Sequence, residues 1–536
     1  MEDSPRGALP RRSALHRSRL EGNAVAASDR TAAAWSPLVL VPLAFSAWVY
    51  LPITHVYFWA DDFLNLGDLV ARDRLEFLLR PFGGHSLLVW RVVCLIAYTL
   101  FGIRAEPHYI LILATHLLNV ALLFVLVRSL TGSALLACLG ATLWGTSPLA
   151  AGTIGWYSVY GQVLAAFLLL VVLARVTHRG AAARPPSGRA AWGWSGCMLL
   201  ASLCFGVGIG MALVFPAVLF LLRPDAWTRP VRVPSLVLPV VTVALYFGLR
   251  HLYASIAPMT VGEALQLAVA RASLGGVPRV LAELLGFSVA ASVRGFAMAP
   301  DTYPDAASMA TVAGFAGGVA LALAYGEPDV RRAISAMLVL ALGIYGVIAV
   351  GRASYYVLFH VAPATLAAWP RFHYAGTIPI VVLLCLVAEQ AARFSHRAVA
   401  VRAFALAAAT IVGVVGFARS GFQIDDHRAV GTYVATALAQ IRAAVAAQPP
   451  GTTVYLDNGD LPLTLRSLAI NQEMLPGRAA LFVLVAPSGI LDGRRVRFIE
   501  PDPHVLVYPD RAPKLGALLV PRETATRSGP AVVRAP

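Results

Sequence analysis

The sequence predicts an α-helical polytopic membrane protein with a small α/β unit after its last helix. Three observations predict this fold class. The chain is 58% hydrophobic and only 13% charged, whereas a soluble domain carries about 25% charged residues. Apolar runs of near-spanning length recur from Pro37 to Ala418. After Arg419 the pattern changes to short apolar runs between proline and glycine turns.

The net charge is strongly positive, at +15, and almost all of it is arginine because Lys514 is the only lysine. An excess of arginine in short loops is typical of the cytoplasmic face of a membrane protein. No basic run alternates with aromatic residues in a soluble segment, so nucleic acid is not an expected partner. The expected surroundings are those of the membrane lipid bilayer.

Composition divides the chain into three parts. Residues 1–34 are rich in Arg, Ser and Ala, which predicts a disordered basic cytoplasmic tail. Residues 35–419 predict the transmembrane domain, with a polar outer loop over residues 54–107. About eleven spans are expected in this domain. They lie near residues 37–53, 108–127, 131–149, 159–175, 193–206, 208–222, 234–250, 307–325, 333–351, 373–391 and 401–418.

Arginine placement determines the predicted orientation. If residues 87–103 stay on the outer side, the turns that carry Arg128, Arg223 and Arg331 all face the cytoplasm, as the positive-inside bias requires. We therefore expect a multi-pass plasma (inner) membrane protein with a cytoplasmic N-terminus and an extracytoplasmic C-terminus. The apolar stretch 281–298 is expected to lie as an interfacial helix on the outer side.

Residues 420–536 predict a small extracytoplasmic α/β domain. Thr432–Ala447 has the pattern of a helix. Short strands are expected at Thr453–Asp457, Leu481–Val485, Val496–Glu500 and Val505–Tyr508.

The main chemical signal is a pair of adjacent acids, Asp61 and Asp62, just past the first predicted span. Two carboxylates at a membrane surface repel each other, and dehydration disfavours ionising both. Such a pair suits a general base or a ligand for a divalent cation. The alternative is a polar loop in which an aspartate caps a helix that begins at Phe63.

This acidic pair resembles the hallmark of the polytopic GT-C glycosyltransferases. These enzymes use polyisoprenyl-phosphate sugars and include the protein O-mannosyltransferases and the lipid A aminoarabinose transferase. Similar features follow in the same order along residues 35–180 and 350–420. They are His85, Arg91, Phe101-Gly102, Pro107-His108, His116, Asn119, Arg128, Gly132, Pro148 and Arg371-Phe372-His373-Tyr374.

The resemblance implies a GT-C-like fold and an inverting transfer from a polyisoprenyl-phosphate-linked sugar donor to an acceptor hydroxyl on the outer face. Asp61 or Asp62 would be the general base, and Asp61 is favoured because relatives most often use the first acid. Arg371 would hold the lipid phosphate, because its planar fork matches phosphate oxygens. The acceptor would be a glycan, a lipid or a protein. Further substrate-binding candidates are His85, Arg352, His373 and Tyr374.

The sequence departs from the family pattern at one point. Many relatives carry a second acid in the outer loop after the third span, but the segment 155–162 has no carboxylate here. This departure leaves a divalent metal ion as an open question. Trp156 and Tyr157 in that segment are expected either to stack on a sugar or to belong to an interfacial aromatic belt.

Two other interpretations of function stay open. A multi-spanning transporter or lipid flippase would place ionisable residues in mid-membrane, and a non-catalytic envelope-polysaccharide assembly partner would lack the second acid. Within the spans, His116 and Asn119 are expected to form helix–helix hydrogen bonds. The glycines of the segment 206–210 are expected to serve close helix packing rather than phosphate binding, because no strand precedes them.

Overall fold

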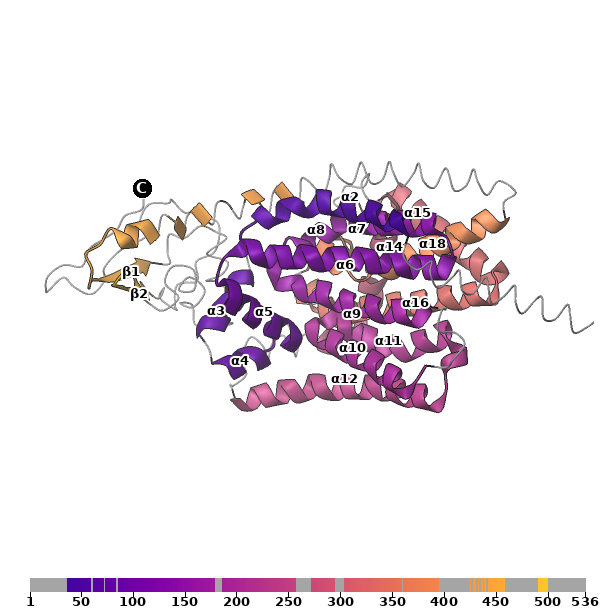
Figure 1. The fold of residues 1–536 in the computed structure, drawn as a ribbon, viewed down its shortest axis with the longest axis horizontal. Helices are drawn as coiled ribbons and strands as arrows, with labels where there is room; N and C mark the ends of the chain where they lie inside the picture. Colours follow the sequence, from indigo (N-terminus) through magenta and orange to yellow (C-terminus); the bar gives the residue numbers. More distant parts are fainter. Residues whose placement is uncertain are drawn as a thin grey trace, which may run out of the picture.

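The computed structural model describes residues 36–58, 61–71, 73–82, 85–178, 186–256, 271–294, 303–358, 360–394, 442–457 and 490–499, with scattered positions between 424 and 439. The described chain forms a bundle of long helices that run side by side, with three short helices gathered at one end (Figure 1). A small three-stranded sheet lies beyond that end.

The first half of the bundle contains η1 (Pro37–Val39), α2 (Leu40–Tyr50), η2 (Leu51–His55), α3 (Asp61–Ala71), α4 (Arg74–Leu79), α5 (Leu88–Phe101), α6 (Ala105–Thr131), α7 (Ala134–Gly145), α8 (Pro148–Ile154), η3 (Tyr157–Val159) and α9 (Tyr160–Thr177). The second half contains α10 (Gly188–Cys204), α11 (Gly206–Leu222), η5 (Pro224–Ala226), α12 (Arg229–Ile256), η6 (Leu274–Gly276), α14 (Val277–Arg294), α15 (Ala306–Tyr325), α16 (Pro328–Leu358), α17 (Pro363–Ala367), η8 (Pro370–Phe372) and α18 (Thr377–Phe394).

The predicted helical polytopic membrane fold is confirmed. Among the described residues, seven helices are long and apolar enough to cross a membrane, and the bent pair α7 and α8 would make an eighth. Each predicted span from 37–53 to 373–391 coincides with helix, although α10 and α11 have only 17 residues each. The eleventh predicted span, 401–418, lies outside the described residues.

The stretch predicted as an interfacial helix instead packs into the bundle as α14. Its buried positions Val280, Leu284 and Phe287 recur at helical spacing on one face. That face packs against α15, α16, α17 and α18. The helix is also long and apolar enough to span a membrane, so its apolar residues belong to the protein interior as well as to any lipid contact.

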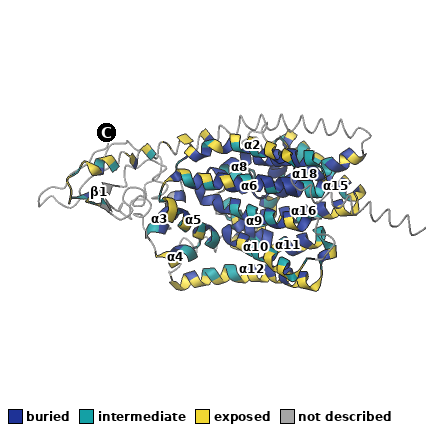
Figure 2. Ribbon diagram, in the orientation of Figure 1, coloured by how far each residue is buried: buried dark blue, intermediate teal, exposed yellow. Residues whose placement is uncertain are grey.

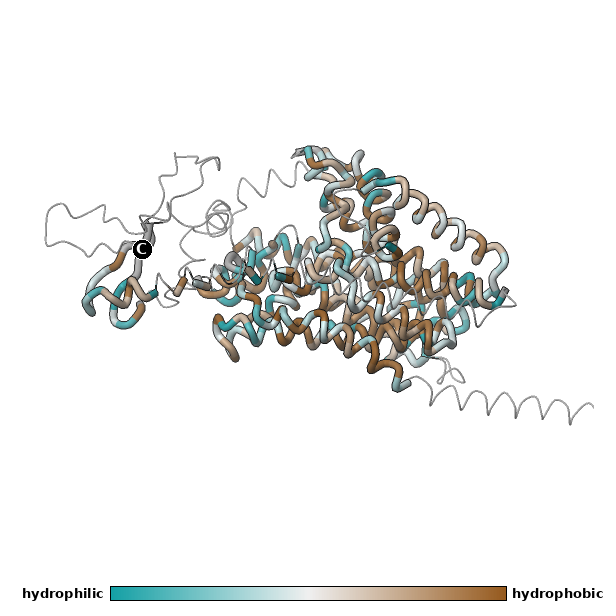
Figure 3. The backbone as a smooth tube through the Cα atoms, turned by 90° about the horizontal axis from the view of Figure 1, so that it is seen from above, coloured by the Kyte–Doolittle hydropathy of each residue, from teal (hydrophilic) through white to brown (hydrophobic). Residues whose placement is uncertain are grey.

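Buried residues follow the seams between helices, while the outer helices expose apolar faces (Figure 2). Along α12, for example, Val240 is 69% exposed and Phe247 is 62% exposed. Hydrophobic residues are concentrated along the length of the bundle (Figure 3). Exposed apolar side chains at this density are stable where the solvent is lipid, as in a spanning bundle.

The predicted span 131–149 is broken between α7 and α8, which meet at an angle of 54°. Ser147 caps α8 by accepting a hydrogen bond from the Leu149 N–H at 3.3 Å, and Pro148 occupies the first turn. Proline favours the start of a helix because its missing N–H is not needed there. The break directs α8 across the bundle toward η8, against which it packs.

The glycines of the segment 206–210 serve close packing, as predicted. A Cβ on Gly210 would lie 2.1 Å from the Gly343 carbonyl oxygen on α16, and one on Gly208 would lie 1.9 Å from the Ala201 carbonyl oxygen on α10. Both distances are far below van der Waals contact. The glycines therefore allow α11 to approach both neighbouring helices.

The C-terminal sheet has the strand order β1-β3-β2. Strand β1 (Thr453–Asp457) pairs in parallel with β3 (Arg494–Ile499), and β2 (Ile490–Leu491) pairs antiparallel with β3. The first and third predicted strands are thus found. The predicted strands Leu481–Val485 and Val505–Tyr508 lie outside the described residues.

Two contacts show at which end of the bundle the predicted cytoplasmic arginines lie. The Arg223 guanidinium donates a hydrogen bond to the Val176 carbonyl at the end of α9 (3.3 Å). Arg393 at the end of α18 forms a 3.2 Å ion pair with Glu327, between α15 and α16. Since α9 and α18 both begin beside the site described below, these arginines lie at the opposite end.

Candidate active site

Helix α3 begins with the acidic pair, and its second acid is held entirely by the protein. Asp62 is fully buried. Its Oδ1 accepts hydrogen bonds from the N–H and the Oγ–H of Ser158, both at 2.6 Å. Its Oδ2 lies 3.5 Å from the Tyr109 hydroxyl. Asp62 therefore joins α3 to η3 and α6 through the contacts of its carboxylate.

The first acid has a different environment. Asp61 is only half-buried, and its carbonyl accepts a hydrogen bond from Asn65 Nδ2 at 3.0 Å. Burial raises the pKa of the Asp61 carboxyl, while Arg371 and Arg352 lower it. The two arginines are thus near enough to act on Asp61 electrostatically. A carboxylate with a raised pKa is a stronger base than an ordinary aspartate.

Arg371 lies in a cradle of aromatic rings. Its guanidinium carbon is 4.6 Å from the Trp369 ring centroid, 5.1 Å from that of Trp156 and 5.3 Å from that of Phe372. Its Nε is buried and has no hydrogen-bond partner. Burial and the neighbouring Arg352 lower the pKa of Arg371, whereas Asp61 raises it. A buried donor left open in this way is available to a ligand.

The main chain of Arg371 is fixed by α8 and α9. Gln162 Nε2 donates a hydrogen bond to the Arg371 carbonyl at 2.9 Å, and the Thr153 hydroxyl lies 3.5 Å from the same oxygen. A Cβ on Gly152 would lie 2.8 Å from Pro370 Cβ, so only glycine allows η8 to approach α8 this closely. The break between α7 and α8 thereby positions the arginine.

His373 points into the bundle, where its contacts are with Ala367, Tyr345 and Phe287. It is fully buried. Its Nε2 lies 2.6 Å from the Ala367 carbonyl and its Nδ1 lies 3.0 Å from the Tyr345 hydroxyl. Because a carbonyl only accepts, Nε2 carries the proton of the neutral ring. The Tyr345 hydroxyl that lies beside Nδ1 also donates to Ser288 Oγ at 2.6 Å. Both nitrogens are used by the protein.

Tyr374 is also an internal residue. Its hydroxyl contacts His116 Nδ1 at 2.9 Å and accepts from Asn119 Nδ2 at 3.1 Å. His116 Nε2 donates to the Gly145 carbonyl at 3.0 Å, and Asn119 also donates to the Val163 carbonyl at 3.0 Å. The predicted helix–helix hydrogen bonds of His116 and Asn119 are therefore confirmed, and they anchor the turn that carries Arg371.

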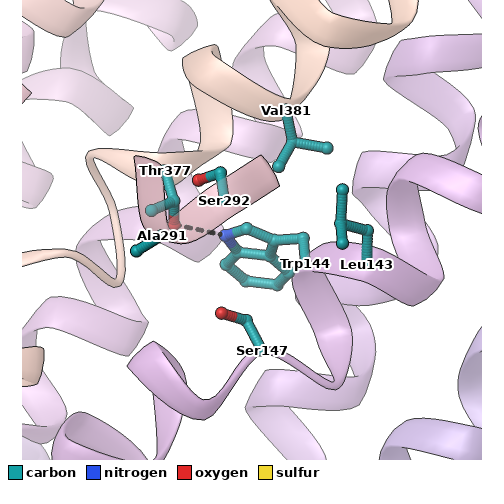
Figure 4. Close-up of a pocket in the computed structure, with 7 residues that line it drawn as sticks. All are labelled: Leu143, Trp144, Ser147, Ala291, Ser292, Thr377 and Val381. Atoms are coloured by element: carbon teal, nitrogen blue, oxygen red, sulfur yellow. Dashed lines mark hydrogen bonds between the residues drawn. The ribbon is translucent and has the colours of Figure 1, made fainter. Parts of the chain in front are cut away.

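A small cavity lies behind this turn rather than at the acidic residue. Trp144 donates from Nε1 to the Thr377 hydroxyl at 3.0 Å across one wall, and the hydroxyls of Ser147 and Ser292 lie nearby (Figure 4). The space holds about one water molecule. It contains none of the predicted site residues, so it is a packing feature of the α7–α18 contact.

Arg352 on α16 completes the charged cluster. Its guanidinium carbon is 5.1 Å from the Tyr355 ring centroid and 5.2 Å from that of Phe372. Phe372 therefore contacts two arginines, Arg352 and Arg371. Arg352 and Arg371 both lower the pKa of Asp61 against the effect of burial. Asp61, Arg352 and Arg371 together are the charged cluster.

His85 lies at the edge of this cluster. Its ring packs on Phe205 with centroids 4.6 Å apart and against Gly206 at the start of α11. Burial, Arg352 and Arg250 lower the pKa of His85 to about 3. The ring is therefore neutral at physiological pH, and at this pKa it is a weak base.

Trp156 and Tyr157 have separate environments although they are adjacent. Trp156 stacks on Arg371. Tyr157 is fully buried and packs against His108 at 5.0 Å and Phe58 at 5.8 Å. The structure thus brings Trp156 to the cluster and places Tyr157 in an aromatic core.

The cluster does not fit a metal ion. Among the described residues, no group of three or more His, Cys, Asp or Glu side chains is arranged to hold one. Asp61 has two guanidinium groups as neighbours, and their positive charge opposes a cation there.

Sequence reasoning missed Trp369, Gln162 and Gly152 as parts of the site. Trp369 lies two residues before Arg371, so an aromatic neighbour of a predicted phosphate ligand was the available signal. Gln162 and Gly152 carried no such signal, because their contacts with η8 join segments about 200 residues apart.

No protein-family model and no curated protein matches this sequence. Among solved structures, the fold is weakly similar to that of ArnT from Cupriavidus metallidurans bound to undecaprenyl phosphate. The two chains are 13% identical, the match covers 78% of this chain and 82% of that chain, and the TM-score is 0.43. The function proposed below therefore depends on the residues of the site itself.

Proposed function

We propose that the protein is a membrane glycosyltransferase of the GT-C type that moves a sugar from a polyisoprenyl-phosphate donor to an acceptor hydroxyl at the outer face. The observation that carries the proposal is the cluster of Asp61, Arg371 and Arg352. A half-buried carboxylate and an open buried guanidinium are the two groups that this transfer needs.

Asp61 is the general base of the proposed reaction. It takes the proton of the acceptor hydroxyl, whose oxygen forms a bond to the anomeric carbon while the bond from that carbon to the phosphate oxygen breaks. The electron pair of the broken bond leaves with the lipid phosphate, and the configuration of the anomeric carbon is inverted. Burial, which raises the pKa of Asp61, increases its strength as a base.

Arg371 binds the lipid phosphate in this proposal. Its aromatic cradle removes water from the guanidinium, which strengthens an electrostatic contact with phosphate. The open Nε is one of the donors that such a contact uses. The main-chain anchors of Arg371 hold the group in place before the ligand arrives.

The same arrangement favours an enzyme over a transporter or flippase. His116 and Asn119, the polar residues within a span that were singled out above, are occupied by protein hydrogen bonds. The open charged groups instead gather at one end of the bundle. A non-catalytic assembly partner would share this arrangement, and activity separates the two.

Replacement of Asp61 tests the proposal. Asp61→Asn keeps the shape and removes the basicity, so sugar transfer from a polyisoprenyl-phosphate donor should fall by at least about a hundredfold. Transfer is measured with purified protein and radiolabelled lipid donor. Wild-type transfer by Asp61→Asn would refute the role of this residue as the base.

Asp62→Asn is the matched control at the neighbouring position. It weakens the two hydrogen bonds from Ser158, which are charge-assisted, and should destabilise the fold by about 1.5–3 kcal/mol. Thermal unfolding should therefore show a lower Tm for Asp62→Asn and not for Asp61→Asn. Equal loss of stability in both variants would contradict the division of roles.

A further inference from the structure

Two arginines share one aromatic ring at the site, and the proposed reaction changes the charge in front of them. The guanidinium carbons of Arg352 and Arg371 lie 5.2 and 5.3 Å from the Phe372 centroid. No ion pair to either arginine is recorded among the described residues. Arg352 also lowers the pKa of Arg371, so the two positive charges repel each other unless an anion compensates them.

The sugar donor balances only one of the two positive charges of Arg352 and Arg371. A sugar-linked lipid phosphate is a phosphodiester with one negative charge. The leaving lipid phosphate is a monoester, which carries a charge close to −2 at neutral pH because its second pKa is about 6. At the same step Asp61 receives a proton and loses its charge. The reaction therefore moves one negative charge from Asp61 to the phosphate.

We infer that Arg352 stabilises the second negative charge that develops on the lipid phosphate as the sugar leaves, whereas Arg371 binds the phosphate throughout. This inference rests on the proposed function. Arg371 is suited to constant binding because its main chain is anchored by Gln162. Arg352 stands beside it on α16, stacked on Tyr355 and Phe372.

Because the negative charge moves from Asp61 to the phosphate, both arginines interact with an anion before and after the reaction. Before the reaction, burial raises the pKa of Asp61, while Arg371 and Arg352 oppose that rise and so favour the ionised base. When Asp61 is protonated, that attraction disappears and the field of both arginines acts on the phosphate alone. Interactions that strengthen as the reaction proceeds accelerate the chemical step rather than donor binding.

Two lipid probes test the inference on the full-length protein. One is a polyisoprenyl monophosphate, and the other is its methyl ester, a diester that keeps one charge at every pH. At pH 8, wild-type protein should prefer the monophosphate. Arg352→Gln should reduce that preference about tenfold, because the doubly charged monophosphate loses more affinity than the singly charged methyl ester. Arg352→Lys should recover most of the preference.

Arg279→Gln is the control for the loss of one positive charge. Arg279 on α14 is exposed, and its guanidinium carbon lies 6.0 Å from the ring centroid of Tyr356, which is on α16 with Arg352. This variant should leave the preference unchanged. Tm measurements establish that each variant is folded, and Arg352→Met, which also removes the charge, serves if Arg352→Gln is unstable.

The outcomes separate this inference from the proposed function. Arg371→Ala should weaken both probes, and unchanged binding of both in this variant would overturn the proposed function. If Arg371→Ala weakens both probes but Arg352→Gln keeps the full preference, or weakens both probes equally, the inference about Arg352 is wrong and the phosphate site stands.

Discussion

Two neighbouring aspartates with identical side chains have different environments because they lie on different faces of one helix. Successive residues of an α-helix are rotated by about 100°. That rotation turns Asp62 toward Ser158 and leaves Asp61 near Arg371. The anchoring of Asp62 fixes the first turn of α3, so the structural acid positions the proposed base.

The pH dependence of transfer should report the charge of Asp61. Activity needs the ionised carboxylate, so it should be lost as the pH falls through the pKa of Asp61. Burial raises this pKa above its ordinary value, while Arg371 and Arg352 oppose the rise. Replacing Arg352 with Gln removes one such influence, and the acidic limb of the pH–rate profile should move to higher pH. A limb that moves to lower pH, or stays in place, would show that Arg352 does not act on the base.

Gln162 should act as a positioning residue for Arg371. Gln162→Met keeps the length of the side chain but removes the N–H that donates to the Arg371 carbonyl. We expect lipid-phosphate binding to weaken about three- to tenfold, the effect of one neutral hydrogen bond. Gln390 is a similarly buried glutamine on α18, and Gln390→Met should leave the Kd unchanged. Equal effects of the two variants would show that the role of Gln162 is general packing.

The elements that build the site are irregular, and each irregularity has a local cause. Pro148 and Ser147 start α8 at an angle of 54° to α7, which brings Gly152 to η8. Pro370 begins η8. The turn after it sends the side chains of the segment 371–374 in different directions. Arg371 remains at the aromatic cradle, while His373 and Tyr374 bind inside the bundle.

Close contact between α11 and α16 should be sensitive to a single methyl group. Gly210→Ala would place Cβ 2.1 Å from the Gly343 carbonyl oxygen, so the helices must separate at a cost of about 1–3 kcal/mol. A Cβ on Gly346, on the same helix as Gly343, would meet nothing within 4 Å. Gly346→Ala should therefore be neutral or stabilising by about 0.4–1 kcal/mol. Thermal unfolding in detergent compares the two, and equal Tm values would contradict the packing.

The whole molecule has two chemically different ends. The end that carries α3, η8 and the start of α9 holds the open charged cluster. The other end holds the turns of Arg128, Arg223 and Arg393, since α6, α9 and α18 all run away from the site. The predicted separation of the acidic loop from the arginine-rich turns therefore agrees with the direction of these helices.

Topology reporters should place the two ends on opposite sides of the membrane. A fusion after Arg104, between α5 and α6 at the site end, should score as extracytoplasmic. A fusion after Arg189 should score as cytoplasmic, because of the positive-inside bias, and a fusion after Arg419 as extracytoplasmic. The reverse pattern would put the proposed site on the cytoplasmic face.

Much of the architecture could be predicted from the sequence because hydrophobicity along a chain is a local property. Apolar runs such as 108–127 need a helix in lipid, since unpaired backbone groups are costly there. Strands β1 and β3 were predicted from the same kind of local pattern. Helix α14 was misplaced because its moderate hydrophobicity fits either an interface or a packed seam, and only its neighbours on α16 and α18 decide between them.

The sequence by itself determined the helical membrane class, the positions of most long helices and a short list of charged candidates that includes Asp61 and Arg371. Only the tertiary structure decided which candidates meet. It separated Asp61 from Asp62, kept Arg371, Arg352 and Trp156 together, and turned Tyr157, His373 and Tyr374 inward. The physical reason is that the environment of a side chain is set by contacts between distant segments, and these contacts follow from packing rather than from local pattern.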